Sequence, residues 1–169
     1  MDELLPVGGG PDDVAAGLAA IRNAMQHMPQ SDTAPTEDMF ADGVYLRVMH
    51  MKRGTVVAGA THKTEHFVVI LKGTVKIGDG PNVETFRAPQ IILSKPGAQR
   101  VLFALTDVTL FNIHPDPSNC KSPGKLAEGL IEEPYDEIVG QPNNIQAANG
   151  LRITGGFHEG YLEKRSKAD

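Results

Sequence analysis

Short apolar runs separated by turn residues fill the middle of the chain, between Val44 and Ile113. Residues 44–51 alternate their side chains and are rich in β-forming types, which is typical of a strand with two different faces. Turn signals recur about every eight to twelve residues, the spacing of a β-sandwich or barrel. The expected strands are residues 44–51, 54–58, 67–71, 74–77, 83–86, 91–93, 100–104 and 108–113. The pattern therefore predicts one all-β unit.

A helical pattern precedes the strands. Pro11 suits a first helical position, where no amide hydrogen bond is lost, and Asp12 and Asp13 complement the positive end of the helix dipole. Pro29 stops the helix. The apolar residues that follow Pro11 recur at helical spacing and form one stripe: Val14, Leu18, Ile21, Met25 and Met28. This stripe either packs on the chain's own barrel or contacts another subunit or partner.

Three regions follow from these patterns. We interpret residues 1–41 as a helical arm and linker, and residues 42–116 as the barrel core. Residues 117–169 form a C-terminal extension that is expected to pack on the barrel or on a partner. Nothing repeats internally, so the chain contains one such barrel.

The extension carries two further signals. Residues 123–132 predict a short helix, and Pro134 ends it. The pair Asn149-Gly150 favours a tight turn, which predicts a late hairpin between Ile145 and Ile153.

Composition excludes several classes of protein. The net charge of −5 argues against a nucleic-acid-binding surface, which needs clustered Lys and Arg. No run approaches the roughly 18 apolar residues of a membrane span. The first residues lack the basic start and apolar core of a secretion signal, and the single cysteine, Cys120, rules out an internal disulfide.

A first motif resembles a signature of the cupin superfamily, in which a His-x-His pair and a Glu precede a glycine. Gly73 is that glycine, and His66 stands where the family usually has Glu, with six residues between the two. His62 occupies the second histidine position of the pair. The first histidine position holds Ala60, so this motif departs from the family at two points.

A second motif resembles the other cupin signature. Pro96 and Gly97 are kept, but Arg100 stands where the family has histidine. The resemblance covers roughly residues 44–115 and implies a jelly-roll barrel. The full expected fold is an all-β, single cupin barrel with an N-terminal helical arm and a short C-terminal helix and loop tail.

The resemblance also implies candidate metal ligands, because cupins hold a metal with three or four side chains, usually histidines and one glutamate. Carried over residue by residue, it gives only His62 and His66, while His50 and His114 on flanking strands are weaker candidates. We therefore expect no cofactor; if one is bound, imidazole ligands favour a divalent transition metal such as Zn, Fe, Mn or Ni. Alternatively, His62 and His66 are polar residues that line a cavity, or they lie on a solvated loop through Lys63-Thr64-Glu65.

Arg100 suggests a further use for the same cavity, since a guanidinium group binds carboxylate or phosphate in a bidentate manner. Together with His62 and His66, it is a candidate ligand-binding residue. One alternative is therefore a metal-dependent cupin enzyme that acts on a small anionic molecule. Another is a metal-free cupin, either like a sugar epimerase or binding a small ligand, although aromatic residues are only 5% of the chain.

A narrower resemblance links the chain to small cupin-fold proteins encoded by tailed bacteriophages. It is carried by Lys52-Arg53-Gly54-Thr55, His62-Lys63-Thr64-Glu65-His66, Lys72-Gly73, Ala88-Pro89, Pro96-Gly97 with Arg100, Asp107, and His114-Pro115. It implies a virus-encoded protein, such as a fibre, collar or decoration component of the virion.

We accordingly expect a non-catalytic, oligomeric protein of phage type, a dimer or trimer, with the helical arm as its contact element. Its expected partners are its own copies and virion proteins, with no nucleic acid and no membrane. Its expected location is the host cytoplasm or the virion.

Overall fold

The computed structural model describes residues 20–21, 23–25, 27, 32–78 and 82–132, together with the backbone of three later strands. Those strands are β10 (Asn144–Gln146), β11 (Leu151–Ile153) and β12 (Leu162–Lys164). The helix α2 spans Pro123–Leu130. No helix among the described residues is both long and apolar enough to cross a membrane.

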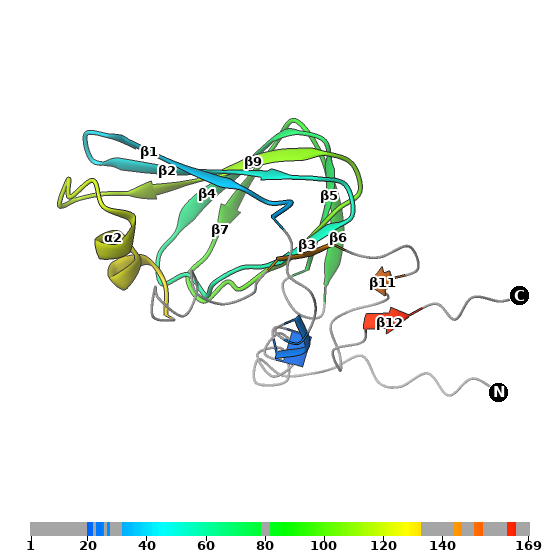
Figure 1. The fold of residues 1–169 in the computed structure, drawn as a ribbon. Coiled ribbons are helices and arrows are strands. Elements are labelled where there is room, and N and C mark those ends of the chain that lie inside the picture. Colours follow the sequence, from blue (N-terminus) through cyan, green and yellow to red (C-terminus); the bar gives the residue numbers. More distant parts are fainter. Residues whose placement is uncertain are drawn as a thin grey trace, which may run out of the picture.

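Two five-stranded antiparallel sheets form the barrel (Figure 1). The first sheet has the order β1-β2-β9-β4-β7, and the second has the order β10-β3-β8-β5-β6. The strands of the first sheet are β1 (Thr36–Ala41), β2 (Val44–Met51), β9 (Val108–Pro115), β4 (His66–Lys72) and β7 (Gln90–Ser94). Besides β10, the second sheet contains β3 (Thr55–Ala58), β8 (Val101–Ala104), β5 (Thr74–Gly78) and β6 (Val83–Arg87).

The core lies between these two sheets, because each strand turns alternate side chains inward. Its buried members come from both sheets: Met51, Val57, Val68, Ile70, Val75, Ile77, Leu102, Ala104, Val108 and Leu110. This arrangement of two facing antiparallel sheets is typical of the cupin double-stranded β-helix, a form of jelly roll. The prediction of a mostly β, cupin-type fold is confirmed.

Two local predictions are wrong. Residues 36–41, which the sequence analysis placed in the linker, form the edge strand β1, where every residue is paired with β2. An edge strand tolerates the polar residues that made this segment look like a loop. The late hairpin between Ile145 and Ile153 is absent, because β10 pairs with β3 while β11 pairs with β12.

The helical arm is described only in part. Residues 20–21 and 23–25 are helical, and both Ile21 and Met25 are buried, with 3% and 0% of their surface exposed. These two side chains are therefore covered within this chain. The other members of the stripe, Val14, Leu18 and Met28, lie outside the described residues.

Gly73 makes the sharp turn from β4 to β5. Its φ of 89° lies in the left-handed region, and a Cβ at this position would collide with the carbonyl oxygen of Asp107 and with Oγ1 of Thr106. The same turn is held by Thr74, whose N–H donates to Oγ1 of Thr106 at 2.9 Å. The glycine of the first cupin motif is thus required by close backbone packing.

A Gly73→Ala substitution should lower the free energy of unfolding by about 2–4 kcal/mol, through backbone strain and the collision with a neighbouring strand end. Gly43→Ala is the matched control, because Gly43 also has a positive φ, of 73°, but its Cβ would meet nothing within 4 Å. The control should lose only about 1 kcal/mol. Urea unfolding measures both; equal losses would contradict the packing argument.

Candidate metal site and its cavity

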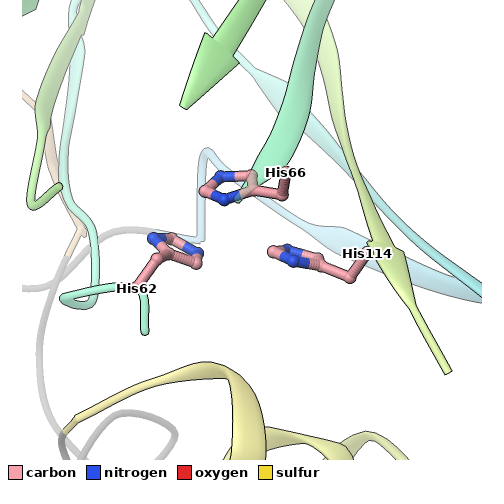
Figure 2. A group of neighbouring side chains, drawn as sticks. All are labelled: His62, His66 and His114. Carbon is pink, nitrogen blue, oxygen red and sulfur yellow. The ribbon is translucent and has the colours of Figure 1, made fainter. Parts of the chain in front are cut away.

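Three imidazole rings converge at one end of the barrel (Figure 2). His62 lies in the loop before β4, His66 is the first residue of β4, and His114 lies near the end of β9. Their ring centroids are 4.1 Å (His62 to His66), 4.4 Å (His66 to His114) and 5.3 Å (His62 to His114) apart. One nitrogen from each ring lies within 4.8 Å of the other two.

The second cupin motif positions His62. The N–H of Gly97 donates to the carbonyl of His62 at 2.7 Å, and the N–H of His62 donates to the carbonyl of Ala98 at 3.1 Å. Gly97 has a φ of 81°, a conformation that glycine adopts without strain. On its other side, His62 forms an isolated β-bridge with Ile131, just after α2. The loop is therefore fixed from both sides.

His66 is oriented by the carbonyl of Thr64, which lies 3.3 Å from its Nδ1. A carbonyl only accepts hydrogen bonds, so this contact places the proton on Nδ1 and leaves the Nε2 lone pair available. Only 3% of His66 is exposed. Burial, reinforced by the charge of Arg100, lowers the pKa of His66, while the Thr64 carbonyl opposes this effect.

His114 is buried to the same extent as His66. It is 4% exposed, stacks on Tyr45 at 5.9 Å, and its buried Nδ1 has no hydrogen-bond partner among the described residues. Burial, followed by the charges of His66, His62 and Arg47, lowers the pKa of His114 to about 3. The ring is therefore neutral at pH 7, which is the form that binds metal ions.

The three residues fit a divalent transition metal. Imidazole nitrogen suits Zn, Fe, Ni and Cu, and three histidines that leave further positions open are a common arrangement for a catalytic metal. A buried polar atom without a partner is costly, and a bound cation is the kind of partner that would satisfy Nδ1 of His114. The contact from Thr64 to His66 is of the type that orients metal-bound histidines.

A cavity of about 320 Å³ opens beside the rings. Tyr45, Arg47, His62, Asn112 and His114 form its polar wall, while the helix α2 contributes an apolar wall that includes Ala127 and Leu130. A deeper pocket of about 70 Å³ continues from it, since both are lined by His62 and Asn112, and it reaches His66 and Arg100. A small molecule in the cavity would therefore lie against the three rings.

Arg100 lies in the wall of the deeper pocket, next to the rings. Its guanidinium donates through Nη1 to Oγ of the buried Ser94 at 2.5 Å. Ser94 is directly opposite His66 in the pairing of β4 with β7. The arginine that replaces the histidine of the family motif thus places a fixed positive charge beside the candidate metal site.

A second arginine lies at the outer wall. Nη1 of Arg47 is 3.4 Å from the hydroxyl of Tyr45 and 3.6 Å from the carboxylate of Asp38. The Tyr45 hydroxyl donates to Asp38 at 2.5 Å, and burial together with this hydrogen bond raises the pKa of Tyr45 to about 12. Sequence reasoning missed Tyr45, Arg47 and Asn112, although each shares its strand face with a residue of the core or site.

The structure brings together His62, His66 and His114, with Arg100 beside them, but it separates His50 from this group. Nδ1 of His50 is 3.3 Å from Oγ1 of Thr109, and its Nε2 is 3.6 Å from the carboxylate of Glu37. His50 is on β2, where the odd-numbered residues Tyr45, Met49 and Met51 face the interior, so its even position turns it to the opposite face. His50 is therefore not a ligand of the cluster.

No protein-family model matches the chain, and no curated protein matches its sequence. Among solved structures, it is similar to a cupin superfamily protein from Desulfitobacterium hafniense DCB-2 (10% identity, 52% of this chain and 82% of that chain, TM-score 0.46). It is also similar to a protein with a double-stranded β-helix domain from Klebsiella pneumoniae (14% identity, 63% of this chain and 90% of that chain, TM-score 0.47). A third similar structure is salicylate 1,2-dioxygenase from Pseudoaminobacter salicylatoxidans (9% identity, 70% of this chain and 33% of that chain, TM-score 0.49). At such low identities, and with TM-scores below 0.5, these likenesses say nothing about the ligands or activity of this chain.

Proposed function

We propose that this cupin-fold protein binds a divalent transition metal through His62, His66 and His114, and that the metal site receives a small anionic molecule from the adjoining cavity. The observation that carries the proposal is the convergence of three imidazoles, two of them buried, on the wall of that cavity. The sequence analysis expected no cofactor because the family motif supplied only two ligands, His62 and His66. His114 adds a third candidate ligand.

Anion binding is supported by the charge of the site. Arg100 contributes a permanent positive charge to the deeper pocket, whereas the charge of Arg47 at the outer wall is offset by the carboxylate of Asp38, 3.6 Å away. Among the described residues, no Asp or Glu side chain lines the cluster or the two pockets. The deeper pocket is therefore positive with or without a metal, and a carboxylate would be attracted to it.

In this proposal each residue of the site has a separate role. A metal held by the three rings would act as a Lewis acid toward an oxygen of the bound molecule. Arg100 would hold a carboxylate of that molecule, the apolar face of α2 would exclude water, and Asn112 would orient polar groups between the two pockets. Whether the bound molecule is transformed or only held depends on its chemistry, and both uses require the same site.

Oxalate binding to the zinc-loaded protein tests the proposal, with isothermal titration calorimetry as the measurement. Elemental analysis should first give about one metal per chain. Arg100→Gln should then weaken oxalate binding by about 10–100-fold, because it removes a charged hydrogen-bond donor, while zinc content stays the same. Arg87→Gln is the matched control, since Arg87 is exposed on β6, in the second sheet. Oxalate affinity that does not depend on Arg100, or protein that takes up no zinc, would overturn the proposal.

The expected place of the protein in a phage virion stays a prediction. A metal-binding cupin barrel is compatible with a virion component, because a bound metal also stabilises a fold. Detection of the protein in purified particles would test that role independently of the metal.

A further inference from the structure

The helix α2 lies outside the two sheets, at the end of the barrel where the three imidazole rings converge (Figure 1). It supplies no residue to the histidine cluster. Its buried side chains, Leu126, Ala127 and Leu130, pack with Tyr45 and Ile131. Both ends of the helix are nevertheless joined to segments that carry candidate metal ligands.

The start of α2 is joined to the strand that carries His114. Just after this strand, the carboxylate of Asp116 accepts hydrogen bonds from the N–H groups of Cys120 at 3.1 Å and Lys121 at 3.2 Å. The N–H of Asp116 donates to the carbonyl of Gly43 at 2.8 Å. These contacts hold the short connection between β9 and α2, so the start of the helix has a fixed position relative to His114.

The end of α2 is joined to the loop that carries His62. The N–H of Lys63 donates to the carbonyl of Leu130 at 2.8 Å, and the N–H of Glu132 donates to the carbonyl of Thr61 at 2.9 Å. The residues on both sides of His62 are therefore bonded to the end of the helix or to the residues just after it. A shift of this end of α2 would move His62 relative to the other two rings.

Lys63 adds a side-chain contact to this junction. Its Nζ donates to the carbonyl of Glu128 at 3.1 Å. The last four carbonyls of a helix have no partner within the helix, and a cation near them interacts favourably with the helix dipole. The last turn of α2 contains no basic residue of its own, so the cation comes from the His62 loop. Lys63 thus bonds two of these carbonyls, one through its backbone and one through its side chain.

We propose that Lys63 is a positioning residue for His62, which sets the metal affinity of the site by holding the end of α2 against the His62 loop. This inference rests on the proposed function, because it concerns the same three rings. Partners that orient metal ligands contribute about 10–100-fold to metal affinity, and an exposed lysine that acts through a backbone segment should contribute less. Charge alone has the opposite effect, since removal of a cation near the site would strengthen the binding of a metal ion.

The zinc affinity of the full-length variant Lys63→Met tests the proposal, with chelator competition as the measurement. The variant should bind zinc about 3–10-fold more weakly than the wild-type chain. Lys63→Arg keeps a cation that can donate to the carbonyl of Glu128, so it should recover the wild-type affinity to within about twofold. Lys95→Met is the matched control, because Lys95 is also an exposed lysine near the site but pairs with Glu65. It should bind zinc at least as tightly as the wild-type chain.

Hydrogen exchange of the metal-free protein provides a second measurement that does not depend on zinc. Lys63→Met should speed exchange in residues 61–63 and 123–132 together, whereas Lys95→Met should not. Faster exchange in both segments with weaker zinc binding, recovered by Lys63→Arg, supports the proposal. Unchanged exchange, or a zinc affinity in Lys63→Met that equals or exceeds that of the wild type, overturns it. A wild-type chain that binds no zinc overturns the proposed function, and the exchange result then supports or overturns the link between α2 and the His62 loop.

Discussion

Replacing His114 with phenylalanine should lower the affinity of the protein for zinc at pH 7 by at least about 100-fold. A residue that only orients a metal ligand contributes about 10–100-fold, so loss of a direct ligand costs at least as much. Phenylalanine retains the stacking on Tyr45 and the volume of the buried ring, so the variant should stay folded. Competition with a chromophoric chelator measures the affinity.

The matched control is His50→Phe. His50 is also a histidine on a neighbouring strand of the first sheet, but it lies beside Thr109 and Glu37, outside the cluster. This control should bind zinc as tightly as the wild-type chain. An equal loss of zinc affinity in the two variants would mean that zinc binding does not depend on the three-histidine cluster in particular. An unchanged zinc affinity in the His114→Phe variant would exclude His114 from the site.

The metal-free protein should lose about 2–3 kcal/mol of stability when the pH falls from 7 to 4.5. The pKa of His114 is about 3 in the folded chain, against an ordinary value of about 6.5 in the unfolded chain. Between pH 6.5 and pH 4.5, His114 is therefore protonated in the unfolded chain but neutral in the folded chain. The free energy of unfolding consequently falls by about 1.4 kcal/mol per pH unit. The lowered pKa of His66 acts in the same direction.

Urea unfolding of chelator-treated protein at pH 7, 6, 5 and 4.5 measures this dependence. The His114→Phe variant has no titrating group at this position. Between pH 7 and 4.5 it should therefore lose about 2–3 kcal/mol less stability than the wild-type chain loses. The range stops at pH 4.5 because carboxylates contribute below it. One of them is Asp116: burial acts to raise its pKa, but hydrogen bonds from Cys120 and Lys121 outweigh burial and lower it. A variant with the same pH dependence as the wild type would contradict the burial of a neutral His114.

Much of the fold follows from the sequence. The apolar runs and turn residues between Val44 and Ile113 locate every strand from β2 to β9 to within about two residues, because those strands are short and their turns are marked by glycine and proline. The edge strand β1 was missed, since its polar residues resemble a loop. The partner of β10 was missed as well, because pairing between distant segments leaves no local signal.

The site was predicted only in part, for a reason that lies in the strands themselves. His62 and His66 were found through a motif, but His50 and His114 could not be told apart. On a strand, alternation shows which residues face inward only when one face is polar. In β9 both faces are apolar, because Leu110 lies in the core while Phe111 and Ile113 lie on the opposite face. The apolar outer face of β9 therefore hid the inward orientation of His114.

The number of imidazole nitrogens bound to the metal tests the central claim most directly. X-ray absorption spectroscopy of the zinc-loaded protein counts them from the scattering of the ring atoms. We predict three imidazoles from the wild-type chain, two from His114→Phe, and three from His50→Phe. Two or fewer imidazoles in the wild-type spectrum, or a count that does not change when His114 is replaced, would contradict a metal site formed by His62, His66 and His114.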